Sequence, residues 1–177
     1  MKEYANIDEA LEDVEKNLNE VLKIAKKRIE NIPDKNNWRD LVLVTDKAFG
    51  LIFDTILEFV YPDDDTWKKL RFEDKARMIG KLKILNDIYE RDLIILNNVR
   101  VHVAHEMEID EKKIKGYLHG THTYNYNKVK MRDMTLQEKY YNISLRALYI
   151  LRHHHGQFVA SYLNKMDGWQ GSYYNYD

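Results

Sequence analysis

Five polar residues interrupt an otherwise apolar stretch in the middle of the chain. The segment from 93 to 105 reads LIILNNVRVHVAH, and its polar members are Asn97, Asn98, Arg100, His102 and His105. Read as a helix, the segment is apolar on nearly every side, which is typical of a buried central helix. Ionisable side chains on such a helix cost free energy unless they are paired. Acid–base or phosphate chemistry is therefore expected here first.

The helical period separates these residues into two groups. At about 100° per residue, one stripe carries a set of polar side chains, namely Arg91, Asn98, His102 and His105. Arg100 lies in the apolar stripe, about 140° from His105 around the helix axis. One straight helix therefore does not bring Arg100 and His105 together, unless it ends near His105 or the two residues act from different subunits.

A metal site is one chemistry that the histidines allow. His102, His105 and Glu106 are spaced by three and four residues, so a helix would let them converge on one ion. His119 and His122, further along the chain, are additional potential ligands. These spacings match no named zinc or di-iron motif, so we expect no metal ion and no other cofactor.

The elements that position these residues are predicted to be helices. Apolar residues recur at spacings of three and four, and Pro33 and Pro62 each follow a long helical pattern. The sequences at 6–9 and 135–138 resemble capping boxes, in which a first residue and one three positions later satisfy the first backbone N–H groups. We expect main helices over 7–32, 38–61, 72–85, 88–105 and 135–165, with a short one over 66–70.

The segment from 106 to 133 shows no clear period. It is polar, contains Gly116 and Gly120, and is predicted to be a long connection, with a small hairpin or an ordered loop at 117–124. Long loops in compact domains are often functional, so this one is a candidate cover for the central helix. Aromatic and basic residues lie close together over 124–132, where Tyr124 and Tyr126 precede Lys128, Lys130 and Arg132. They suit stacking on exposed bases or ordinary packing, and both interpretations stay open.

A second basic run lies between 68 and 83. Its members are Lys68, Lys69, Arg71, Lys75, Arg77, Lys81 and Lys83. The simpler interpretation is a solvated helix face, and a phosphate-binding surface is the alternative.

Composition limits the class of protein. The chain has 177 residues, a net charge of −1 and no cysteine, which excludes disulfides, cysteine-bound zinc and thiol catalysis. Residues 1–10 lack the apolar core of a signal peptide, and no apolar run is long enough to span a bilayer. We expect one soluble, cytoplasmic all-α domain over 1–177, a bundle of about five main helices. Residues 168–177 are expected to fray or to pack their aromatic side chains onto the body.

The central helix resembles a known family. The stretch 72–105, especially LNNVR at 96–100 and VAH at 103–105, resembles the core of the mannitol operon repressor family. The wider HEPN (higher eukaryotes and prokaryotes nucleotide-binding) superfamily carries a similar Arg-x4–6-His motif on a helix of an all-α bundle. This chain differs at two places, with Val101 where a polar residue often follows the arginine and Met107 where some toxins carry a tyrosine.

The HEPN resemblance implies a metal-independent endoribonuclease or an RNA-binding protein, in a toxin or antiviral setting. Cleaving RNA through its own 2′-hydroxyl requires a base and an acid, and a histidine can serve as either. His105 is the candidate acid or base, and Arg100 would stabilise the charge that develops on the phosphate. Asn97, Asn98 and His102 would hold the phosphate or the histidine ring.

Two alternatives stay open. Arg100 is equally well explained as a structural ion-pair partner, with His105 a satisfied core histidine. The chain would then be a non-catalytic regulatory or protein-interaction module of the mannitol-repressor kind. In either case we expect a homodimer, with the long first and last helices available for its seam, and a protein partner such as an antitoxin is a further expectation.

Overall fold

Helix is the only regular structure in residues 7–61, 64–82, 87–106 and 108–166, which are the residues that the computed structural model describes. The predicted all-α fold is confirmed over this part of the chain. Eight α-helices and one 3-10 helix (η1) follow one another there: α1 (Ile7–Glu30), α2 (Trp38–Val60), η1 (Thr66–Lys69), α3 (Phe72–Lys81), α4 (Asp87–His105), α5 (Glu111–His119), α6 (His122–Tyr126), α7 (Lys128–Met131) and α8 (Leu136–Met166).

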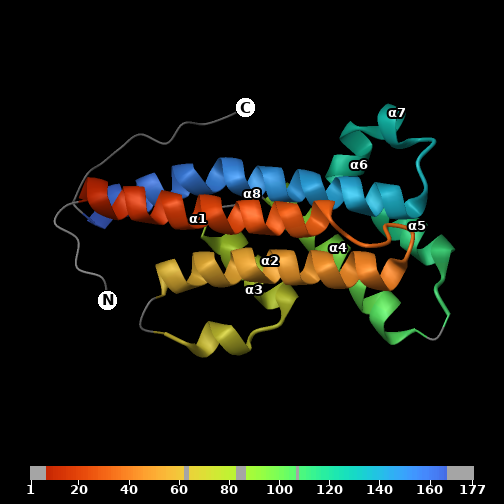
Figure 1. Ribbon diagram of the computed structural model, residues 1–177, viewed down its shortest axis with the longest axis horizontal. Helices are drawn as coiled ribbons and strands as arrows, with labels where there is room; N and C mark the ends of the chain where they lie inside the picture. Colours follow the sequence, from red (N-terminus) through yellow and green to blue (C-terminus); the bar gives the residue numbers. More distant parts are fainter. Residues whose placement is uncertain (1–6, 62–63, 83–86, 107, 167–177) are drawn as a thin grey trace.

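The three longest helices run along the bundle. Helix α1 packs on both α2 and α8, and all three extend along the long axis in Figure 1. Leu18, Leu22, Ala25 and Ile29 of α1 are buried within the chain. The expected use of the first and last helices as a dimer seam stays a prediction.

Aromatic rings fill the core beneath these helices. Phe49 and Phe53 on α2 are fully buried, and Phe72 at the start of α3 lies edge-on to both of them. At the other end of α2, Trp38 packs edge-on against Tyr140 of α8, with ring centroids 5.9 Å apart. These contacts join α2 to α3 and to α8, and α4 packs on the same three helices.

Helix α4 is surrounded on most sides, as predicted for the central helix. It packs on α2, α3, α5, α6 and α8, and it buries Leu93, Leu96, Val99 and Val103. Near its C-terminal end one side reaches the surface, where Val101 is 39% exposed. The polar residues of α4 are thus divided between the core and an open edge.

The prediction of an irregular connection over 106–133 was wrong. The chain forms three short helices there, α5, α6 and α7, which gather at one end of the bundle (Figure 1). A hairpin at 117–124 was also wrong, because the segment is helical except at the turn around Gly120. Helices this short bury too few residues to leave a visible period in the sequence. Their ends are fixed by caps instead, with Asp110 and Thr121 accepting from the backbone N–H groups of Lys113 and Tyr124.

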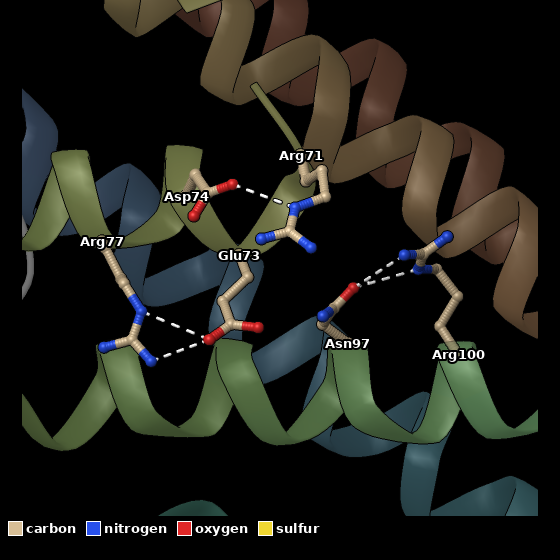
Figure 2. Close-up of polar contacts among 6 residues, drawn as sticks. All are labelled: Arg71, Glu73, Asp74, Arg77, Asn97 and Arg100. Carbon is tan, nitrogen blue, oxygen red and sulfur yellow. Dashed lines mark hydrogen bonds and ion pairs between the residues drawn. The ribbon is translucent and has the colours of Figure 1, made fainter. Parts of the chain in front are cut away.

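Four members of the basic run around α3 have counter-ions of their own. Arg71 donates to Asp74 and Arg77 donates to Glu73, both within the helix (Figure 2). Other pairs are Lys68 with Asp65, and Lys75 with Asp54 on α2. Lys68 and Lys75 also lie over the ring of buried Trp67, with the amine nitrogens 5.5 and 5.6 Å from its centroid. These ion pairs favour the interpretation as a solvated helix face over that as a phosphate-binding surface.

Several predicted features lie outside the described residues. These are the cap at Asn6, the helix stop at Pro62, the end of the 72–85 helix from 83 to 85, Met107 and the tail from 168 to 177. No described helix is long and apolar enough to cross a bilayer.

Candidate functional site

Arg100 is bound by side chains of its own subunit. Its Nε atom lies 3.2 Å from Oδ1 of Asp46 on α2. Its Nε and Nη2 atoms also donate to Oδ1 of Asn97, one turn earlier on α4, at 3.1 and 3.0 Å. Figure 2 shows the side chain running from α4 toward α2. The ion pair lies at the rim of the core, since the side chains of Arg100 and Asp46 are 30% and 29% exposed.

A buried hydroxyl cluster lies next to this ion pair. Burial raises the pKa of the Asp46 carboxyl above its ordinary value, and the charge of Arg100 offsets only part of that rise. Tyr140, from α8, is fully buried here, and burial together with the Asp46 charge raises the pKa of its phenol. The charge of Arg100 acts in the opposite direction on this phenol. The hydroxyl of Thr45 is also buried, and it has no hydrogen-bond partner among the described residues. The region is thus a polar centre shared by α2, α4 and α8.

The structure does not bring His105 to Arg100. His105 is the last residue of α4 and is exposed, whereas Arg100 points toward α2. No hydrogen bond or ion pair links the two residues in the part of the chain that the structure describes. The helix does end at His105, which was one condition under which the two residues could meet. Their side chains nevertheless lie in different surroundings.

The predicted supporting residues have separate structural places. Asn97 is 6% exposed and holds the Arg100 guanidinium, while Asn98 is half-buried. His102 is also buried, and its Nε2 atom accepts a hydrogen bond from the backbone N–H of Asp110 at 3.1 Å. This hydrogen bond ties the end of α4 to Asp110, the N-cap residue of α5. Of the predicted site residues, only Asn97 contacts Arg100.

The possible metal ligands do not converge either. The Nδ1 atom of His102 lies 3.7 Å from Oε1 of Glu106. Within the described ranges, no group of three or more His, Asp or Glu side chains is placed to hold an ion.

Two carboxylates that the sequence analysis missed have central roles. Asp46 neutralises Arg100, and Asp92, which is 1% exposed, accepts from the backbone N–H groups of His122 and Thr123 at 2.7 and 2.9 Å. Asp46 lies inside an apolar helix segment, the same signal that identified Arg100, whereas Asp92 follows two charged residues at the edge of such a segment. Applied to carboxylates, this signal would have found Asp46.

A second cluster of polar and aromatic residues lies where α5, α6 and α8 meet. His119 stacks on Tyr124, with ring centroids 4.2 Å apart and planes 16° apart. Its Nε2 atom is buried without a hydrogen-bond partner. Burial lowers the pKa of His119, and the nearby charges of Lys139, Lys115 and Lys128 lower it further. The folded protein therefore favours the neutral ring.

This environment predicts a pH dependence of stability. Since the pKa of His119 is lower in the folded than in the unfolded state, its contribution is fully present above about pH 6.5, the unfolded value. It declines as the pH falls from there through the folded-state pKa. His119→Phe keeps the stacked ring and removes the titration. We expect the wild type to lose stability relative to this variant below about pH 6.5, measured by urea unfolding from pH 8 to pH 5. Parallel stability curves would contradict the prediction.

Comparisons of this chain with protein-family models, with curated proteins and with solved structures found no match. The resemblance to the mannitol operon repressor family and to HEPN proteins stays a prediction from the central helix.

Proposed function

We propose that the protein is a non-catalytic helical interaction module that acts through the exposed edge formed by α2 and α4. The observation that supports this proposal is the pairing of Arg100 with Asp46 and Asn97 of the same chain. An arginine that stabilises a reacting phosphate must offer its donors to that phosphate. Here a carboxylate already occupies that position, and its negative charge would repel a phosphate.

The surroundings of the ion pair favour contact with a protein. Leu43, 52% exposed, lies one turn before Asp46 on α2. Val101, 39% exposed, follows Arg100 directly on α4. Exposed apolar side chains around a partly solvated ion pair resemble the apolar patches with polar rims that mark contact surfaces.

A cleavage assay tests the non-catalytic assignment. Purified protein with EDTA is incubated with end-labelled RNA, alongside Asp46→Asn, which keeps the side-chain shape and removes the charge opposite Arg100. We expect no cleavage from either protein. Metal-independent cleavage by the wild type that is lost in both Arg100→Ala and His105→Ala would overturn the proposal.

The second candidate is a metal-independent endoribonuclease assembled by two subunits. The specific observation in its favour is that His105 is exposed at the end of α4 while the Arg100 side chain keeps 30% exposure. A two-fold contact along α4 would place the histidine of one copy beside the arginine of the other.

Thiol cross-linking tests that arrangement directly. Because the chain has no cysteine, Val101→Cys introduces a single thiol on the exposed edge of α4. The two-subunit candidate requires rapid disulfide formation between two copies of this variant. The matched control is Lys27→Cys on the exposed side of α1. Equal, slow cross-linking of both variants would exclude a two-fold contact along α4.

A further inference from the structure

The helices α5, α6 and α7, together with the start of α8, carry an excess of positive charge. Over residues 111–139 the chain has seven Lys or Arg residues and three carboxylates, in a protein whose net charge is −1. Glu111 is the first residue of α5, Glu138 accepts from the backbone N–H of Thr135 in a helix cap, and Asp133 lies near Arg132. The remaining cations are Lys112, Lys113, Lys115, Lys128, Lys130 and Lys139.

Three of these lysines differ from the four paired cations around α3 in having no counter-ion among the described residues. Among the described residues, no carboxylate lies within 4 Å of the amine of Lys115, Lys128 or Lys130. Lys139 is only 6% exposed, yet its amine reaches nothing stronger than the backbone carbonyl of Arg132, at 3.5 Å. The Lys139 ammonium therefore adds a positive charge at the start of α8 that no carboxylate contact among the described residues offsets.

A second unsatisfied polar atom lies close by. The Nε2 atom of His119 is buried and has no hydrogen-bond partner. The charges of Lys139, Lys115 and Lys128 all lower the pKa of this ring, so cations from α8, α5 and α7 contribute to the positive potential around it. Because the Nε2 atom is buried, a bound phosphate would meet the exposed side chains of Lys115 and Lys128 rather than the ring.

Aromatic rings extend this region onto the surface. Tyr126 is 78% exposed and stacks on His122, with ring centroids 6.3 Å and planes 24° apart. His122 in turn meets the ring of Tyr89 edge-on at 5.8 Å. The backbone of His122 is anchored by buried Asp92, so this row of rings is held in place. With this exposure, Tyr126 keeps ring surface open to solvent next to Lys128.

We infer that α5, α6, α7 and the start of α8 form a binding surface for single-stranded nucleic acid. Lysine side chains would hold its phosphates, and Tyr126 would stack on a base. Base–aromatic stacking beside a cationic surface is the usual way in which proteins hold unpaired strands. An acidic protein segment would satisfy the lysines but would leave the exposed ring unused. The surface is separate from the Arg100–Asp46 pair, so it extends the proposed function without depending on it.

The test compares ligands of equal charge with and without bases. Full-length protein is titrated with a labelled single-stranded oligonucleotide, with inorganic polyphosphate and with poly-glutamate, in the presence of EDTA. We expect the oligonucleotide to bind most tightly. Its logarithmic affinity should fall with log salt at a slope of about −2, as for roughly three released counter-ions.

Variants separate stacking from charge. Tyr126→Ala should weaken oligonucleotide binding about tenfold, the loss of one stacked base, and leave polyphosphate binding unchanged. The double variant Lys128→Glu, Lys130→Glu should weaken both. The matched control is Tyr149→Ala, since Tyr149 is also exposed beside a cation, with Arg146 5.2 Å from its ring centroid on α8. This control should change nothing.

Three results would overturn the inference. The first is no oligonucleotide binding at low salt by protein whose helical circular dichroism is intact. The second is equal binding of oligonucleotide and polyphosphate with no effect of Tyr126→Ala, which would indicate a site for phosphate alone. The third is preferential binding of poly-glutamate. Since none of these measurements depends on cleavage or on association through α4, they can fail independently of the proposed function.

Discussion

Replacing Asp92 with alanine is expected to destabilise the protein by about 3 kcal/mol. Asp92 is 1% exposed and accepts from two backbone N–H groups at the start of α6, at 2.7 and 2.9 Å. Alanine removes both acceptors while Thr123 stays buried, so its N–H loses its partner without gaining water. Urea unfolding followed by circular dichroism measures the loss, and faster hydrogen exchange at the His122 and Thr123 amides would locate it.

Two controls define the cause of this effect. Asp92→Asn keeps one side-chain oxygen as an acceptor, so it should retain part of the stability. Asp133→Ala removes a carboxylate whose side chain is 91% exposed, and it should change stability by less than about 0.5 kcal/mol. If Asp92→Ala were no worse than Asp133→Ala, the anchoring of α6 by Asp92 would be contradicted.

The long helices were predictable because each carries its signal locally. The capping box at Thr135 is an example, since its backbone N–H donates to Glu138 at 2.7 Å and its hydroxyl accepts from the Glu138 N–H at 3.2 Å. Both partners lie within one helical turn. The apolar spacing of α1, α2 and α4 is equally local, and their predicted ranges differ from the observed ones by only one or two residues at most ends.

The helices α5, α6 and α7 could not be predicted in the same way. The acceptor that fixes the start of α6 belongs to Asp92 on α4, 30 residues before His122. The backbone N–H that starts the turn into α5 is held by His102, also on α4. Local caps at Asp110 and Thr121 also mark the starts of α5 and α6, but helices this short show no apolar period, so the polar composition of the segment suggested a loop.

The sequence identified residues of the candidate site but not the side chains with which they pair. The apolar context correctly marked Arg100 as a residue that needs a partner. That partner is Asp46 on α2, and nothing near Arg100 in the sequence indicates it. The helical period did indicate that Arg100 and His105 diverge, and the structure agrees. The sequence can therefore identify a charged residue that needs a partner. Whether that partner is a carboxylate of the protein or a phosphate of a ligand depends on how the helices pack.

Phe53→Ala is expected to cause the largest loss of stability, about 3–5 kcal/mol. The ring is fully buried at the middle of α2, 5.0 Å from the ring of Phe72 and 6.1 Å from that of Phe49. Alanine would leave a cavity between α2 and the start of α3, and it would remove the favourable edge-on contact with Phe72. Because α3 has only ten residues and packs mainly on α4 and α2, we expect it to close the cavity poorly.

A graded series of variants distinguishes the effect of the cavity on stability from a general destabilisation of helix α2. Phe53→Leu removes less volume and should cost less than half as much as Phe53→Ala, whereas Glu58→Ala, at an exposed position of the same helix, should cost less than about 0.5 kcal/mol. Urea unfolding of the three variants gives the free energies directly. A Phe53→Ala protein as stable as Glu58→Ala would mean that the contact between α2 and α3 does not hold the core. Asp46, the partner of Arg100, lies on α2 as well, so the placement of this ion pair would then be contradicted too.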